Sequence, residues 1–196
     1  MNQKTLQKQK GFTIIETLFS IFILLLSITG PLTFAQSGLR ASFLARDQIT
    51  AFYLAQDSIE TIKHLRDNYA LGGGTGHWLT DLNGCKPENA LGNNPGEAKS
   101  CRIDTSGATI ELQSCSDIEN SCARLYYDAD SRKYTHNTIG TEISKYSRIV
   151  HVAEISQDRE AQVVVEVEWE NNFFSDRRIV VQENIYNWVS SFANQN

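Results

Sequence analysis

The feature that most constrains this chain is a long apolar run near its N-terminus, from Phe12 to Ala35. Its 24 residues would form a helix about 36 Å long, enough to cross the hydrocarbon core of a bilayer. Residues 1–11 carry three lysines and no acidic side chain, and this positive flank favours a cytoplasmic location for that end. We therefore predict a single-pass membrane protein whose C-terminal bulk lies outside the cytoplasm.

Glu16 does not fit a plain membrane anchor, because it lies five positions into the apolar run. A carboxylate at bilayer depth costs about 2.5–3.5 kcal/mol and marks a functional hypothesis whose partner should be named. If the chain were cut after Gly11, the new α-amino group of Phe12 would be a suitable cation, most naturally that of a neighbouring subunit. The alternative is that Glu16 lies close enough to the membrane interface to stay hydrated.

The segment Lys-Gly-Phe-Thr-Ile-Ile-Glu-Thr-Leu at residues 10–18 resembles the processing site of type IV prepilins and pseudopilins. The resemblance implies that a membrane-embedded prepilin peptidase cuts after Gly11, and that the same enzyme methylates the new N-terminal amine of Phe12. It also implies that Glu16 is the glutamate of that family. An ordinary secretory signal ending at residues 33–35 is the main alternative, although its apolar core would be unusually long and its glutamate without purpose.

Beyond the apolar run, the pattern predicts that one helix continues to about Asn68. Gly30 and Pro31 match, approximately, a place where helices of the prepilin family often kink, and proline removes a helical hydrogen bond. An apolar stripe with a spacing of three to four residues follows and indicates packing against a sheet. The stripe consists of Ala45, Ile49, Phe52, Ala55, Ile59 and Ile62.

The C-terminal part reads as β-structure. Residues 161–170 alternate apolar and polar side chains, which is typical of an antiparallel strand covered on one face only. Further strands are expected at 109–113, 123–127, 133–136, 146–155 and 178–188, with a turn at Asn171-Asn172. We therefore predict an α+β fold of the type IV pilin kind, in which a long N-terminal helix packs on a four- or five-stranded antiparallel sheet. The closing strands resemble those of V-type minor pilins and I-type pseudopilins.

These patterns divide the chain into four segments. We expect a cleaved leader at 1–11, a transmembrane helix at 12–35, an amphipathic continuation at 36–68 and a β-rich head at 69–196. A loop insertion at 72–100 is rich in glycine and in turn-forming residues.

Four cysteines, Cys85, Cys101, Cys115 and Cys122, all follow the apolar run, which favours disulfides formed outside the cytoplasm. Three pairings are possible, and we favour Cys85–Cys101 and Cys115–Cys122 because both close local loops. A four-thiolate zinc site is the rival hypothesis, but its ligands usually come in closely spaced pairs.

The composition argues against several classes of function. The net charge is −5, and 15 basic against 23 acidic side chains remain without the first ten residues, so direct binding of nucleic acid is not expected. His64, His77, His136 and His151 have no metal-ligand spacing, and the aspartates at 128–130 lack the further ligands of a calcium loop. We expect no enzyme, no metal and no cofactor.

The leading hypothesis is a structural, minor subunit of a type IV pilus-like filament. Its expected partners are the prepilin peptidase and methyltransferase, other pilin subunits, the pilus assembly platform and, before assembly, membrane lipid. The mature protein would leave the cytoplasmic membrane for a pilus or the cell surface. Two alternatives stay open: a pseudopilin of a type II secretion or DNA-uptake machine, and a membrane-anchored or secreted extracellular binding module.

Overall fold

The computed structural model describes residues 11–72, 77–82, 85, 100–107, 109–115, 122–170 and 177–188. The chain forms two compact units, Met1–Asp47 and Gln48–Asn196. The predicted leader, apart from Gly11, lies outside the described residues, as do most of the 72–100 insertion and the Asn171-Asn172 turn.

A single helix, α1, runs from Ile14 to Leu71 and is 58 residues long. It begins where the carbonyl of Thr13 accepts the backbone N–H groups of Glu16 and Thr17. It ends just before Gly72, where a Cβ atom would lie 3.0 Å from the carbonyl oxygen of Asn68. The helix therefore continues three residues beyond the predicted end at Asn68, because Tyr69, Ala70 and Leu71 contain no breaker.

Within the first unit, α1 buries none of its large apolar side chains. From Ile14 to Phe43 these side chains are 53–82% exposed. In the described part of the chain, α1 is the helix that is long and apolar enough to cross a membrane. Among the described residues, none covers the apolar surface of this half of the helix.

In the second unit, seven described strands form one antiparallel sheet. They are β1 (Ser100–Asp104), β2 (Glu111–Ser114), β3 (Arg124–Asp128), β4 (Lys133–Thr135), β5 (Glu142–Ser156), β6 (Glu160–Trp169) and β7 (Arg177–Tyr186). A short 3-10 helix, η1 (Thr80–Leu82), precedes them. The predicted α+β architecture is confirmed.

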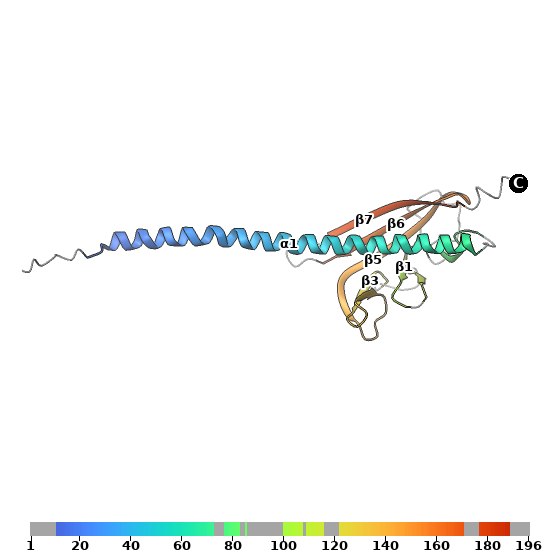
Figure 1. Ribbon diagram of the computed structural model, residues 1–196, viewed down its shortest axis with the longest axis horizontal. Coiled ribbons are helices and arrows are strands. Elements are labelled where there is room, and N and C mark those ends of the chain that lie inside the picture. Colours follow the sequence, from blue (N-terminus) through green and yellow to red (C-terminus); the bar gives the residue numbers. More distant parts are fainter. Residues whose placement is uncertain are drawn as a thin grey trace, which may run out of the picture. The chain divides into compact units, whose positions relative to one another are not determined.

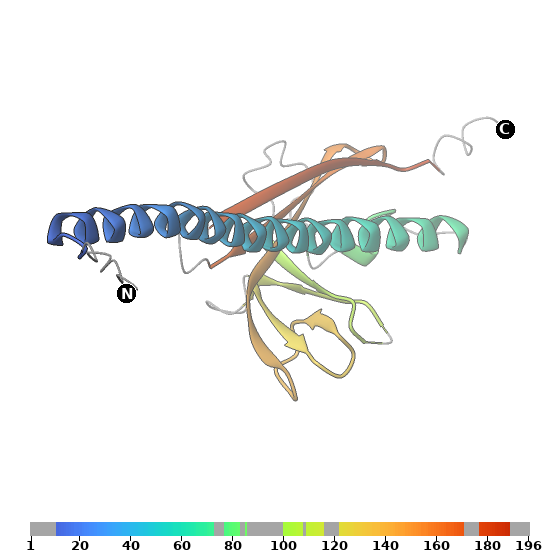
Figure 2. The ribbon, with the colours of Figure 1, turned by 60° about the vertical axis from the view of Figure 1, so that its left-hand side comes forward.

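The long strand β5 organises this sheet. One of its edges pairs with β6, which in turn pairs with β7, and the register aligns Val150, Val165 and Val181 across the three strands. Its other edge pairs with β1 near Val150 and with β3 toward its N-terminal end. In Figure 2 the yellow-green and yellow strands lie on one side of β5. Strands β6 and β7 lie on its other side.

The core of the second unit lies between one face of this sheet and the residues of α1 after Gln48 (Figure 1). The helix contributes buried side chains spaced three to four residues apart: Ala51, Leu54, Ala55, Ile59 and Ile62. The sheet contributes alternate residues of β5 and β6, including the fully buried Val150, Val163 and Val165. Alternation on the strands and helical periodicity on α1 thus meet in one apolar layer.

The strand count differs from the four or five expected. Strand β1 was missed because Ser100–Asp104 contains a single aliphatic side chain, Ile103, next to the turn-rich insertion. Strand β5 begins four residues earlier than expected, and β2 covers 111–114 rather than 109–113. Short polar strands carry little periodic signal, and pairing with a neighbour is what forms them.

Candidate functional site: the N-terminal helix and the buried head clusters

Gly11 and Phe12 lie before the first turn of α1. Phe12 is 77% exposed, and a Cβ atom at Gly11 would meet no other atom within 4 Å. The predicted cut would therefore fall between two exposed residues just outside a helix, where the backbone is not engaged in helical hydrogen bonds.

Glu16 lies in the first turn of α1 and is exposed. Its position near the helix N-terminus is favourable, because the partial positive charge of the helix dipole lies there. Within the described residues, its carboxylate forms no hydrogen bond or ion pair. It is also the only charged side chain between Phe12 and Leu39.

The hydroxyl groups from Thr17 to Ser37 contrast with Glu16, because carbonyl oxygens of the same helix accept their hydrogen bonds. Each donates to a backbone carbonyl three or four residues earlier, at oxygen–oxygen distances of 2.8–3.3 Å. The donors are Thr17, Ser20, Ser27, Thr29, Thr33 and Ser37. Such internal pairing suits hydrocarbon surroundings, where water cannot serve as a partner.

Pro31 lies inside α1, and the helix continues through it. The pair Gly30-Pro31 therefore does not end the helix in this structure. Thr33 donates its hydroxyl to the carbonyls of Thr29 and Gly30, at 3.0 and 2.8 Å. A Cβ atom at Gly30 would meet no atom within 4 Å.

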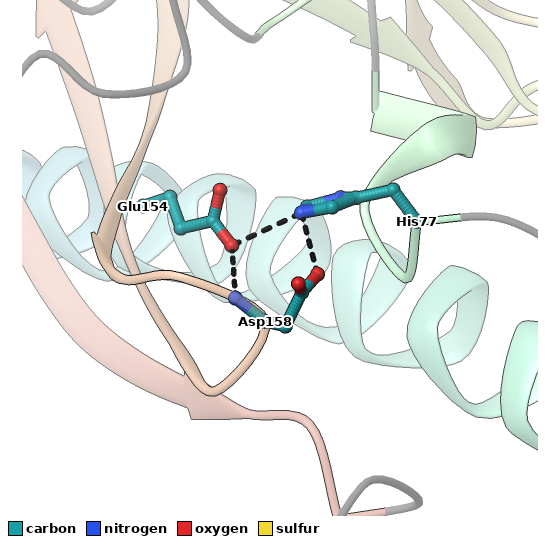
Figure 3. A group of neighbouring side chains, drawn as sticks. All are labelled: His77, Glu154 and Asp158. Atoms are coloured by element: carbon teal, nitrogen blue, oxygen red, sulfur yellow. Dashed lines mark hydrogen bonds and ion pairs between the residues drawn. The ribbon is translucent and has the colours of Figure 1, made fainter.

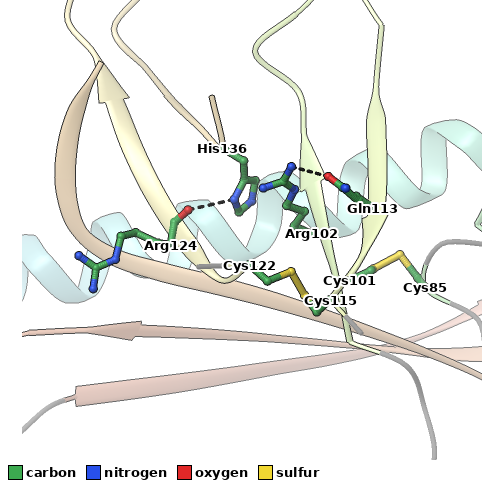
Figure 4. Close-up of a disulfide and its surroundings, with 8 residues drawn as sticks. All are labelled: Cys85, Cys101, Arg102, Gln113, Cys115, Cys122, Arg124 and His136. Carbon is green, nitrogen blue, oxygen red and sulfur yellow. Dashed lines mark hydrogen bonds between the residues drawn. A yellow bond between two sulfur atoms is a disulfide. The ribbon is translucent and has the colours of Figure 1, made fainter. Parts of the chain in front are cut away.

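The four cysteines form two disulfides, Cys85–Cys101 and Cys115–Cys122, with Cα–Cα distances of 4.9 and 5.4 Å. This is the pairing that closes local loops. Figure 4 shows how the first bond attaches Cys85 to the start of β1 and how the second connects the end of β2 to the residues before β3. Cys85 and Cys101 are fully buried, so the first disulfide is also part of the core.

Apart from the disulfides, the head contains a polar cluster formed by Asp104 and His136. The carboxylate of Asp104 accepts hydrogen bonds from the backbone N–H groups of Ser106 and His136 and from the hydroxyls of Ser106 and Thr135. Burial opposes its ionisation, but these bonds outweigh burial and lower the pKa of Asp104 to about 2.

The ring of His136 is 6% exposed, and its Nδ1 donates to the carbonyl oxygen of Arg124 at 3.0 Å (Figure 4). Burial, together with the nearby charge of Arg148, lowers the pKa of His136 to about 4. The imidazole is therefore neutral at pH 7, and its Nε2 has no hydrogen-bond partner within the described residues. This cluster stabilises the region where the strands β1 and β4 end.

A third cluster joins His77, Glu154 and Asp158, which sequence analysis did not bring together (Figure 3). His77 Nε2 lies 3.1 Å from Glu154 Oε1 and 2.9 Å from Asp158 Oδ1. Glu154 Oε1 also accepts the backbone N–H of Asp158 at 2.7 Å. Sequence spacing could not predict this cluster, because His77 lies far from Glu154 and Asp158 in the chain.

The hydrogen bonds of His77 decide what this cluster can do. Its Nδ1 accepts the backbone N–H of Leu79 at 3.2 Å, so Nε2 carries the ring proton and donates to the two carboxylates. A metal-bound histidine needs the opposite arrangement, with a free lone pair on the ligating nitrogen and a proton on the other. As arranged here, the cluster is a polar contact between the segment that precedes η1 and the end of β5 with its β5–β6 turn.

The aspartates of the β3–β4 turn are likewise engaged by the turn itself. Asp128 accepts the backbone N–H of Asp130 at 2.9 Å and the hydroxyl of Ser131 at 2.7 Å. These bonds, the Ser131 hydroxyl first, lower the pKa of Asp128. The turn is closed by residue 132 in the left-handed region, with φ of 57°.

Comparison with known proteins bears on the N-terminal segment. Residues 6–30 match the family model described as the prokaryotic N-terminal methylation motif. The match contains Gly11, Phe12, Glu16 and Gly30. Searches of curated proteins and of solved structures find no match to the chain.

Proposed function

We propose that this chain, which carries a type IV prepilin-type N-terminal cleavage and methylation domain, is a minor structural subunit of a type IV pilus-like filament. The methylation motif and the apolar N-terminal helix support a type IV pilin-like protein, and the helix fits a single-pass membrane anchor. The motif implies a structural protein that a prepilin peptidase processes and that assembles with other pilins.

The observation that carries the proposal is the contrast within residues 12–39. Every hydroxyl donor on the described helix from Thr17 to Ser37 is satisfied by the helix itself, whereas the Glu16 carboxylate has no partner within the described residues. A charge that lipid or neighbouring helices remove from water needs a counter-charge. Cleavage after Gly11 would create a cation at Phe12, and packing of helices would bring the amine of one subunit to the carboxylate of the next.

The apolar surface of the first unit supports the same proposal. The large apolar side chains from Ile14 to Phe43 stay at least 53% exposed in the single chain, so they require lipid before assembly and neighbouring helices after it. The acidic head and its two disulfides fit a location outside the cytoplasm. Its size and its long insertion favour a minor subunit over a major one.

The test compares Glu16→Ala with Glu60→Ala in the native host. Glu60 is an exposed glutamate of the same helix, in the second unit, and serves as the matched control. Both variants should be inserted, cut after Gly11 and methylated on Phe12, which intact mass and N-terminal sequencing would establish. Only Glu16→Ala should be depleted from sheared filaments, by about tenfold if its ion pair is worth about 1.4 kcal/mol.

The other outcomes separate the alternatives. Wild-type incorporation of Glu16→Ala would refute the pairing of Glu16 with Phe12. A mature chain beginning at Met1 or Gln36 would refute prepilin processing and leave a simple anchor or a secreted module. Processed protein that stays in a periplasm-spanning complex and never reaches surface filaments would identify a pseudopilin.

A further inference from the structure

The core of the second unit contains a charged side chain, Arg148 of β5, which is 2% exposed. Its Nη1 donates to the carbonyl oxygen of Leu54 at 3.0 Å and to Asp57 Oδ2 at 3.1 Å, both on α1. Its Nη2 donates to the carbonyl oxygen of Ile103 on β1 at 2.6 Å. One guanidinium therefore joins the central strand to the helix and to a neighbouring strand.

Burial of Arg148 in the core carries a desolvation cost. Removing a guanidinium from water opposes its charged form, so burial lowers the pKa of Arg148. Its counter-charge is only half buried, since the side chain of Asp57 is 47% exposed, and its Nε has no hydrogen-bond partner within the described residues. Apolar residues of similar volume often replace buried ion pairs without loss of stability, so such pairs are best explained by what they specify.

The helix face that Arg148 contacts has an ambiguous pattern. Its buried residues repeat every three to four positions, so α1 displaced by one turn would still present mostly small or apolar side chains to the sheet. The position of the acidic side chain, in contrast, distinguishes one register of α1 from the others. One turn of four residues in either direction would replace Asp57 by Tyr53 or by Thr61, and neither can neutralise a guanidinium.

We infer that Arg148 is a positioning residue that sets the axial register of α1 on the sheet, through its contacts with Leu54 and Asp57. The apolar layer holds the helix against the sheet, and the guanidinium selects one of its possible positions. Arg148, Leu54 and Asp57 all belong to the second unit, so the inference concerns that unit alone and does not depend on the proposed function.

An independent contact reports this register. Lys63 Nζ of α1 lies 2.5 Å from Glu183 Oε1 of β7, and both side chains are more than a third exposed, within reach of a reagent. A zero-length carbodiimide would join this amine and this carboxylate as an amide. Displacement of α1 by four residues moves Lys63 by about 6 Å and brings Ile59 or Asp67 opposite Glu183, neither of which can form the amide.

The experiment uses the full-length chain purified in detergent and compares Arg148→Met with the matched control Arg178→Met. Arg178 lies on β7 of the same sheet, and its exposed side chain pairs with Glu166. Mass spectrometry would quantify the Lys63–Glu183 cross-link. We expect Arg148→Met to fold with both disulfides and to lose about half or more of the cross-link, because registers of equal energy are equally populated. Arg178→Met should keep the wild-type yield.

Two results with the Arg148 variants would overturn the inference. One is an unchanged cross-link in a folded Arg148→Met chain. The other is failure of both Arg148→Met and Arg148→Leu to fold, because Arg148 would then support the fold itself. Asp57→Asn, which keeps the Leu54 and Ile103 contacts, should give an intermediate yield and must not match wild type. The cross-link is measured in isolated protein, so its outcome tests the inference independently of filament assembly.

Discussion

The two units use the same helix in opposite ways. Before Asp47, α1 exposes its apolar side chains, and Ile23 is a typical case at 53% exposure. After Gln48 the helix buries one face against the sheet, and Ile62 is completely inaccessible. Both residues are isoleucines in an unbroken helix, so intrinsic propensity does not distinguish them. What differs is whether the chain supplies a partner surface.

The comparison shows why only one unit is complete in a single chain. The second unit satisfies its apolar surface and most of its buried polar groups internally, through the sheet, the disulfides and clusters such as Asp104–His136. In the first unit the helix backbone satisfies the hydroxyls from Thr17 to Ser37, but no described residue covers the apolar surface or pairs with Glu16. Lipid or neighbouring subunits must supply the rest, which is the physical basis of the proposed role in a filament.

The largest expected effect comes from truncating one isoleucine in each half. Ile62→Ala should lower the free energy of unfolding of the head by about 2–5 kcal/mol, because it removes buried methyl groups and leaves a cavity. Ile23→Ala should change it by less than about 0.5 kcal/mol. Urea titration of the detergent-solubilised chain, followed by tryptophan fluorescence, measures both, since all three tryptophans lie in the second unit. Equal losses would mean that the first unit is packed too.

A second prediction concerns pH and only the second unit. The pKa of His136 is about 4 in the folded chain, against 6.5 for an unperturbed histidine. The unfolded state therefore binds a proton first as pH falls, and stability that is complete above pH 6.5 decreases by about 3 kcal/mol by pH 4.

The variant His136→Asn keeps an N–H donor for the Arg124 carbonyl but does not titrate. Its free energy of unfolding should therefore fall less steeply than that of wild type between pH 6.5 and 4. Urea titrations at several pH values measure the difference between the two slopes. Parallel curves would show that His136 is not buried as a neutral ring.

The smallest effect is expected at Gly30, in the first unit. Alanine is favoured over glycine by about 1 kcal/mol inside a helix, and a Cβ atom at Gly30 meets nothing within 4 Å. Gly30→Ala should therefore slow amide exchange in peptides around residue 30 by about fivefold. Exchange in the head should not change. Altered exchange in head peptides would show that the two units are coupled energetically.

Much of the fold could be predicted from local patterns. The strand at 161–170 was predicted because Val163, Val165 and Val167 alternate with polar residues, and it forms as β6 over Glu160–Trp169. Strand β1 could not be predicted, because its five residues gain their structure from pairing with β2 and β5. The same limit applies to the His77–Glu154 contact, which spans 77 positions.

The sequence alone determined the processing segment, the membrane-length apolar run and the unusual position of Glu16. These are properties of consecutive residues, and consecutive residues are what a motif records. The tertiary structure decided which half of α1 finds a partner, that Arg148 lies inside the core against Asp57, and that the proton of His77 faces two carboxylates. Each of these depends on distances between residues far apart in the chain, and packing of the whole sheet against the helix sets those distances.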